Sequence, residues 1–259
     1  MVQRLKADFS LLIVSLIWGL TFVTVKNAIA DMAPFTFIAI RFAIAFLFMS
    51  LFCYKKLLKL DSRGWLSGIL VGIFLFSGYS FQTMGLQYTT ASNAGFITGL
   101  SVVMVPLFCS LINRKLPSPL VLAGAALAGI GMGFLCLNKG YTYNLGDVLV
   151  LMCAVSFALH IIFVGRYALH TDVTVLASIQ IGVVAVLSCI AALGFEAHVP
   201  VRFSRDVWIG LITTAIPATS LAFFIQTYSQ KYTTPMHTAI ILSTEPVFAG
   251  IFGYLLLDE

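Results

Sequence analysis

Charged residues are scarce in this sequence. They make up 10% of its 259 residues, and the 50-residue stretch from Gly64 to Asn113 contains no Lys, Arg, Asp or Glu. Soluble domains carry a charge about every fourth residue, so a run of this length excludes a water-soluble fold for that part of the chain. The run is long enough for two membrane-spanning helices of about 20 residues each. The protein is therefore expected to work inside a lipid bilayer.

The sequence also lacks the common motifs of catalytic, metal and nucleotide sites. It contains no His-Glu-x-x-His metal motif and no Gly-x-x-x-x-Gly-Lys phosphate loop. No second carboxylate within an apolar run is available to pair with Glu245. We therefore expect no cofactor and no metal, and an intramembrane enzyme is the least favoured function. The five cysteines are odd in number, which argues against a disulfide framework.

What the sequence does contain is a series of apolar runs of membrane-spanning length. Backbone groups in hydrocarbon must be hydrogen-bonded within the segment, so these runs are expected to be helices. No run shows the alternation of apolar and polar residues that a porin strand needs. We predict an all-α integral membrane fold with nine transmembrane helices, at residues 8–29, 34–54, 65–86, 91–112, 117–137, 146–168, 173–194, 206–229 and 236–256.

Basic residues lie mainly on one side of the predicted helices. With the N-terminus inside, ten of them are cytoplasmic and four are outside, while Arg41 falls within the second helix. This asymmetry predicts a multi-pass protein of the cytoplasmic membrane with a cytoplasmic N-terminus. The net charge of +5 then reflects membrane topology and gives no reason to expect a nucleic acid partner.

A short pattern occurs twice, 144 residues apart. Gln82-Thr83 and Tyr88-Thr89-Thr90 recur as Gln226-Thr227 and Tyr232-Thr233-Thr234, each copy at the junction between one helix and the next. The repeat unit is five helices, an odd number, so the second copy is expected to enter the membrane inverted, as in many transporters. We predict a first repeat over 1–140 and a second over 141–259 that lacks its last helix.

Several segments resemble the ten-helix permeases of the drug/metabolite transporter superfamily, of the EamA type. Residues 16–23 (LIWGLTFV) are similar to their first-helix signature, 88–96 (YTTASNAGF) to the start of their fourth helix, and 245–259 to their ninth-helix signature. Arg41 lies where such permeases commonly carry an arginine. The resemblance covers essentially the whole chain, and it implies efflux of organic solutes such as amino acids, coupled to protons.

The chain departs from this family pattern in two ways. The tenth helix is missing, and the fourth helix has Val105-Pro106 where the ninth has Glu245-Pro246. The second departure argues against identical roles for the two halves.

Polar side chains within the predicted spans are the candidates for substrate binding or coupling, because such groups are costly in hydrocarbon. Arg41 is expected to bind an anionic group or pair with a carboxylate, or else to form a structural ion pair. Glu245, beside the helix-loosening Pro246, is expected to bind a proton or a cationic substrate, or else to tie helices together. Cavity lining and helix-to-helix hydrogen bonding are both open for the remaining candidates, which are Trp18, Gln82, Asn93, Gln180, Gln226, His160 and His237.

The function favoured by these observations is a secondary active transporter that moves a small organic metabolite or drug across the membrane by alternating access. A passive channel and a non-transporting membrane fragment are the alternatives. The expected partners are the small-molecule substrate, the lipid bilayer and protons as the coupling ion. Gly129 and Gly133, spaced by four in the fifth predicted helix, favour a packing or homodimer face.

Overall fold

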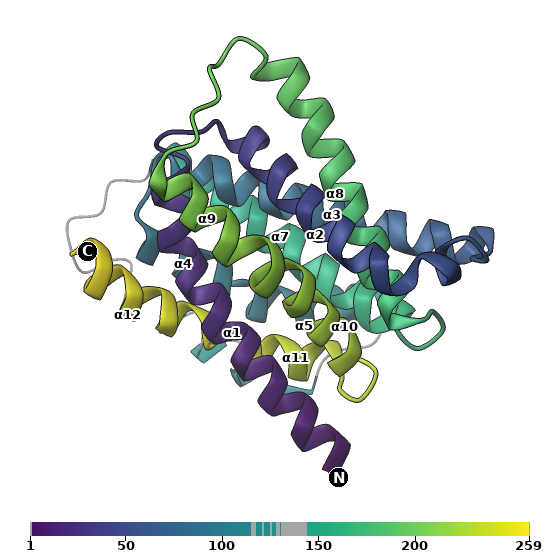
Figure 1. Cartoon of the computed structure of the whole chain (residues 1–259). Coiled ribbons are helices and arrows are strands. Elements are labelled where there is room, and N and C mark those ends of the chain that lie inside the picture. The colour runs from purple at the N-terminus through teal and green to yellow at the C-terminus, as the bar shows by residue number, and fades with distance from the viewer. Residues whose placement is uncertain are drawn as a thin grey trace.

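The fold is a bundle of long apolar helices (Figure 1). The computed structural model describes residues 2–114, 118–120, 122–124, 126, 127, 130 and 144–258. Within these residues, eight helical segments are long and apolar enough to cross a membrane. They correspond to eight of the nine predicted helices and confirm the all-α fold class. The predicted helix 117–137 lies largely outside the described residues, and so do Gly129 and Gly133.

In chain order the helices are α1 (Val2–Ala28), α2 (Pro34–Leu57), α3 (Ser62–Leu86), α4 (Ala91–Gly99), α5 (Ser101–Asn113), α7 (Leu145–Tyr167), α8 (Val173–Phe195), α9 (Arg205–Ala215), η1 (Ile216–Leu221), α10 (Ala222–Ser229), α11 (Pro235–Leu242) and α12 (Glu245–Leu257).

Polar residues cap the starts of several of these helices. The side chains of Asp61, Thr90, Asn144 and Ser204 each accept a hydrogen bond from a backbone N–H three residues further on. Such caps satisfy donors that a helix start would otherwise leave free. The predicted boundaries hold to within three residues except at α1, which begins at Val2 instead of residue 8. Its charged first turns continue the helix beyond the apolar run.

Two of the spans break at corresponding places. The fourth span stops at Leu100 between α4 and α5, and the ninth stops at Ser243 and Thr244 between α11 and α12. Leu100 and Thr244 are 144 residues apart, which is the spacing of the sequence repeat. Ser101 and Glu245 are each the first helical residue after a break, so at this spacing Glu245 matches Ser101 instead of Val105.

The eighth span contains a π-helix, η1, which the apolar pattern did not predict. Pro217 lies in its first turn and cannot donate a backbone hydrogen bond. The hydroxyl groups of Thr219 and Ser220 donate instead to the carbonyls of Thr214 and Ala215, at 2.7 and 3.2 Å. These side chains satisfy backbone oxygens at a local irregularity, and π-helical turns of this kind are frequent at functional sites.

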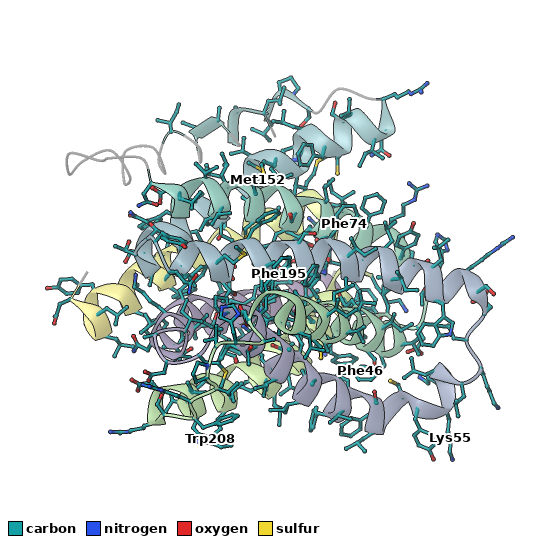
Figure 2. All side chains as sticks on the ribbon, turned by 90° about the horizontal axis from the view of Figure 1, so that it is seen from above. Phe46, Lys55, Phe74, Met152, Phe195 and Trp208 are labelled. Atoms are coloured by element: carbon teal, nitrogen blue, oxygen red, sulfur yellow. The ribbon has the colours of Figure 1, made fainter. Side chains whose placement is uncertain are left out.

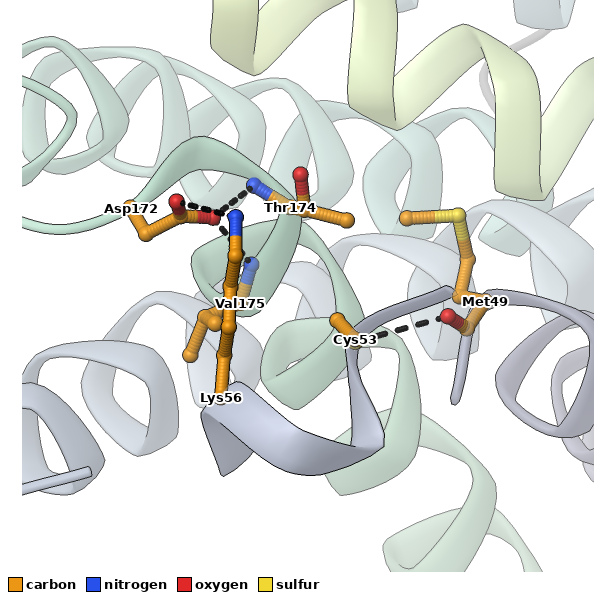
Figure 3. Close-up of polar contacts among 6 residues, drawn as sticks. All are labelled: Met49, Cys53, Lys56, Asp172, Thr174 and Val175. Atoms are coloured by element: carbon orange, nitrogen blue, oxygen red, sulfur yellow. Dashed lines mark hydrogen bonds and ion pairs between the residues drawn. The ribbon is translucent and has the colours of Figure 1, made fainter. Parts of the chain in front are cut away.

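Helices α2 and α8 pack against each other and are joined near both ends. At one end Lys56 Nζ lies 2.8 Å from Asp172 Oδ2, just before α8 (Figure 3). At the other end, Glu196 accepts hydrogen bonds from the backbone N–H groups of Phe35 and Thr36, at 2.9 and 2.8 Å. Because these contacts join opposite helix ends, α2 and α8 run antiparallel along their shared length.

Helix α1 lies beside α12, α9 and α10, as Figure 1 shows, and α3 packs on α7 and α8. The bundle presents large apolar side chains outward, for example Trp208 at its edge in Figure 2. An outward apolar surface of this kind is suited to lipid rather than water. Cys53, Cys109, Cys153 and Cys189 are free thiols, and Cys136 lies outside the described residues.

Candidate functional site

The candidate site is a cavity inside the bundle, between the two helix breaks. Its volume is about 40 Å³ for the centres of water-sized molecules, which is room for about three waters. Residues on α1, α3, α7, α10 and both broken spans line it: Trp18, Thr21, Tyr79, Gln82, Thr98, Gly99, Ser101, Phe157, His160, Ile161, Phe223, Gln226, Leu242 and Glu245. Five of the nine candidates from the sequence are in this set.

Glu245 lines the cavity as the first residue of α12. It was expected near the middle of a continuous helix, but the break at Ser243 and Thr244 places it at a helix start. The partial positive charge of a helix N-terminus favours a carboxylate there. Among the described residues no hydrogen bond or ion pair reaches this carboxylate. The side chain is therefore available to a mobile occupant of the cavity.

Gln82 and Gln226, the matched glutamines of the repeat, both line the cavity. Gln82 Nε2 donates to the Thr98 hydroxyl at 3.3 Å. Gln226 is 1% exposed, and its Oε1 has no hydrogen-bond partner in the described part of the chain. A buried acceptor without a partner costs free energy, so Gln226 has an unmet capacity to bind a donor in the cavity.

Trp18 connects the cavity to the π-helix. Its indole Nε1 donates to the carbonyl of Ala218, within η1, at 2.8 Å. Its ring lies 5.2 Å from that of Phe223, which also lines the cavity. The irregular backbone of η1 thus fixes an aromatic wall of the site.

His160 faces the cavity and is held by a buried hydrogen-bonded chain. Its Nε2 lies 2.6 Å from Gln180 Oε1, and Gln180 Nε2 donates to the Thr227 hydroxyl at 3.2 Å. A carbonyl oxygen can only accept, so Nε2 of His160 carries the proton in this arrangement. Gln180 therefore lies one residue behind the cavity wall and orients the histidine.

Arg41 also lies behind the cavity wall. It is 2% exposed, and its Nε donates to the Thr219 hydroxyl at 2.8 Å. Its guanidinium carbon lies 4.8 Å from the centre of the Tyr79 ring, and its Nη2 is 3.4 Å from the Tyr79 hydroxyl. Within the described residues Arg41 forms no ion pair with Glu245. The interactions of Arg41 with hydroxyls and an aromatic ring orient Tyr79, which does line the cavity.

Asn93 and His237 do not line the cavity. Each is the third residue of its helix, after the capping threonines Thr90 and Thr234. His237 Nε2 lies 3.1 Å from Asp8 Oδ1 and its Nδ1 is 3.4 Å from Arg4. His237 therefore connects the start of α11 with the first turns of α1.

Sequence reasoning left several lining residues out of the candidate set. Tyr79, Thr98 and Phe157 carry no charge, and hydroxyl or aromatic side chains are common at ordinary helix contacts. The repeat gave one usable signal, because Ser101 lies 144 residues before Glu245. Nothing in the sequence pointed to Thr219 as the partner of Arg41, because the π-helix that directs its hydroxyl was not predicted.

A membrane bundle with a polar cavity between broken helices has the features of a transporter. Ligand sites of secondary transporters lie near the bilayer midplane, where discontinuous helices meet. The chain belongs to the EamA-like transporter family, which it matches twice, over residues 5–137 and 144–259. This confirms the resemblance to the drug/metabolite transporter superfamily, and the family is one of transporters rather than enzymes.

Proteins similar over nearly the whole chain carry transporter names. An uncharacterized transporter of Archaeoglobus fulgidus is 39% identical over 263 residues, covering 100% of this chain and 80% of the relative. The uncharacterized transporter YoaV of Bacillus subtilis is 24% identical, with 98% of this chain and 89% of the relative covered. A solved protein crystal structure matches with a TM-score of 0.75 at 18% identity, covering 98% of this chain and 89% of that one. That structural match supports the fold.

Proposed function

We propose that this protein is a secondary active transporter that exports a small organic metabolite or drug across the cytoplasmic membrane in exchange for protons. The observation that carries the proposal is the unpaired carboxylate of Glu245 in a cavity between two helix breaks. A carboxylate without a partner is costly inside a membrane. Binding a proton or a cationic substrate group removes that cost. Because the proton and the substrate compete for this one carboxylate, transport of one is coupled to transport of the other.

The small cavity supports alternating access. Room for about three waters does not accommodate an organic metabolite. Substrate therefore enters only when helices separate on one side of the membrane. The breaks at Leu100 and at Ser243–Thr244 interrupt the two helices that line the cavity from opposite repeats, and they are the positions at which each helix bends.

Helix packing supports the inverted repeat, with units at 1–140 and 141–259. Suppose that α1 corresponds to α7, α2 to α8, α3 to the α9–α10 span, α4 to α11 and α5 to α12. Helix α1 then packs on α9, α10 and α4, as α7 packs on α3 and α11. The pair α2–α8 joins elements that this correspondence exchanges, and the pair α4–α12 has its counterpart in α5–α11. The basic asymmetry of the sequence supports a cytoplasmic N-terminus.

The lining residues have distinct roles in this proposal. Gln82 and Gln226 supply hydrogen-bonding groups for polar parts of the substrate, and Trp18 offers an aromatic face. Arg41 holds Tyr79 in place. Because Nε2 of His160 donates to Gln180, its Nδ1 is left as a hydrogen-bond acceptor in the cavity wall. The aromatic and amide groups favour an amphipathic organic solute, such as an amino acid, over an inorganic ion.

Transport by the purified full chain in liposomes tests the proposal. The liposomes enclose a pH-sensitive dye and face an imposed pH gradient, and a panel of amino acids is added one at a time. A transported solute should accumulate against its gradient with a matching proton flux. Glu245→Gln should abolish gradient-driven accumulation while sparing exchange of substrate for substrate, because exchange needs the motion and no net proton release.

Asp206→Asn is the matched control, because Asp206 is an exposed carboxylate in the first turn of α9, away from the cavity. It should leave flux unchanged. Unchanged gradient-driven flux in Glu245→Gln would remove Glu245 from the coupling role. Flux that neither saturates nor moves protons would instead favour the passive channel.

A further inference from the structure

An open apolar groove runs along the outer face of α2, α3 and α8. Its volume is about 570 Å³ and its lining is apolar throughout, including Phe46 and Leu47 on α2, Trp65 and Ile69 on α3, and Ile179 on α8. This size falls within the range of about 300–1,000 Å³ typical of small-molecule pockets. The groove is separate from the transport cavity, with which it shares no lining residue.

A basic cluster lies at one end of this groove, where α2 ends and α3 begins. We use the term basic cluster for Lys55, Lys56, Lys59 and Arg63, all of which are exposed. Lys55, Lys56 and Lys59 line a surface hollow (Lys55 is labelled in Figure 2). Four basic side chains within nine residues create a positive surface that attracts anionic groups.

The two carboxylates in that hollow are already used. Asp172 pairs with Lys56 at 2.8 Å, as Figure 3 shows, and Asp61 accepts a hydrogen bond from the Gly64 backbone N–H at 3.0 Å. In the part of the chain that the structure describes, no carboxylate lies within ion-pair distance of Lys59 or Arg63. The four basic residues exceed the two carboxylates of the hollow by two charges (4 − 2), so the cluster keeps a net positive charge.

The hollow and the groove are neighbours along α8. Val175 lines the basic hollow, Ile179 and Val183 line the groove, and all three belong to the same apolar cluster. From Val175 to Leu187, the lining of α8 extends twelve residues, or about 18 Å at 1.5 Å per residue. That distance slightly exceeds half of the hydrocarbon thickness of about 30 Å. Together the hollow and the groove span about one leaflet.

Glycines shape the floor of the groove. A Cβ on Gly68 would lie 2.5 Å from Ile179 Cγ2, and one on Gly182 would lie 2.8 Å from Phe46 Cδ2. Because Gly68 has no side chain, α3 approaches α8 closely. Because Gly182 has none, α8 approaches α2 closely. A second apolar groove, lined by Phe96 and Ile251 among others, has no basic residue in its lining.

We propose that this face binds one anionic phospholipid, with its phosphate on Lys55, Lys59 and Arg63 and an acyl chain in the groove. Trp65, in the first turn of α3, lies between the two parts, at the headgroup level where tryptophan is favoured. With a cytoplasmic N-terminus, the cluster faces the leaflet in which anionic lipids attract basic segments. The site combines a basic cluster with a long apolar groove. A free anion would occupy only the basic cluster, and a neutral lipid would occupy only the groove.

Native mass spectrometry of the full chain tests this assignment. The detergent-purified protein is mixed with equal amounts of phosphatidylglycerol and phosphatidylcholine of the same acyl chains, and bound lipid is counted. Phosphatidylglycerol should be retained preferentially, at one per chain. Removing a basic residue near a membrane surface should weaken binding about fivefold, so Lys59→Gln with Arg63→Gln should weaken it about 30-fold.

A groove-filling variant tests the apolar half of the site. Val186→Trp should reduce phosphatidylglycerol retention, while Ile251→Trp in the second groove should not. Arg202→Gln with Arg205→Gln, two basic residues in the connection leading into α9, is the charge control and should retain the lipid. Thermal unfolding of each variant confirms that it is folded.

Three results would overturn the proposal. Equal retention of the two lipids would remove the charge selectivity. Retention by the Lys59→Gln, Arg63→Gln protein equal to that of the original would remove the basic cluster as the headgroup site. A lipid-free dimer that Val186→Trp converts to a monomer would show that a second copy covers the groove.

Discussion

Gly19→Ala tests whether the crossing of α1 and α12 holds the cavity together. Gly19 follows Trp18, and its missing side chain faces the backbone of α12. A Cβ at this position would lie 2.5 Å from Phe248 Cβ, 2.9 Å from Ala249 N and 3.0 Å from the Phe248 carbonyl carbon. Two of these three atoms belong to the helix backbone and cannot rotate away, so α12 itself has to move.

The size of the effect follows from these distances. Non-bonded carbons pack best at about 3.5–4.0 Å, so the 2.5 Å contact is too short by at least about 1 Å (3.5 − 2.5). Overpacking of this kind costs about 1–3 kcal/mol. In a chain of this size that cost should lower the melting temperature by about 2–12 °C. The shift should also move Glu245, three residues before Phe248, relative to Trp18 across the cavity.

Gly194→Ala is the matched control. Gly194 also lies in a helix, but a Cβ there would meet nothing within 4 Å. Both variants gain helix propensity of up to about 1 kcal/mol. The difference between their melting temperatures therefore reports mainly the steric overlap of the new Cβ with α12. Melting temperature in detergent and gradient-driven flux in liposomes are the measurements. A Gly19→Ala protein that melts as high as Gly194→Ala and transports normally would refute the tight crossing.

Three further outcomes are expected. Burial favours the neutral acid of Asp172, but hydrogen bonds from Lys56 and from backbone N–H groups hold its pKa below the ordinary value. The pair is largely exposed, so Lys56→Gln should lower the melting temperature only slightly at neutral pH. That difference should disappear as the pH falls below about 3.9 and through the lower pKa of the folded state; a difference that persists at pH 2 would contradict the ion pair. Thr219→Val removes the acceptor of the Arg41 Nε hydrogen bond and should cost about 1.5–3 kcal/mol in thermal unfolding, whereas an unchanged melting temperature would mean that Arg41 needs no such partner. Gln226→Leu removes an unpartnered buried oxygen and should raise stability by about 1 kcal/mol while lowering transport; lower stability with normal transport would assign Gln226 a structural role.

The helices could be predicted from the sequence because one property decides them. An uninterrupted apolar run in a bilayer has to be helical, whatever its neighbours are. The positions of breaks depend on finer features. Pro246 signalled the break before α12, but nothing in the run of residues around Leu100 distinguishes it from a continuous helix. The 144-residue repeat carries that information, since it relates Leu100 to Thr244 at the other break.

The candidate site was predicted in part, for a related reason. Scarcity of polar groups in the spans pointed to Glu245, Gln82, Gln226, His160 and Trp18, all of which line the cavity. Helix periodicity does not state which polar groups face each other. Asn93 and His237 were included because they lie in apolar runs, and the structure places both at helix starts, outside the lining of the cavity.

The fold treats Arg41 and Glu245, two ionisable residues within the predicted spans, differently, and this difference bears on the proposed function. Arg41 is fully enclosed, and its charge is met by fixed partners, Thr219 and Tyr79. An arginine keeps its charge under all ordinary conditions, so permanent partners suit it. Glu245 has no fixed partner among the described residues and borders the cavity. A carboxyl group can lose its charge by taking up a proton. Of these two residues, the one that can change its charge is therefore the one without a fixed partner, which is what the proposed coupling role of Glu245 requires.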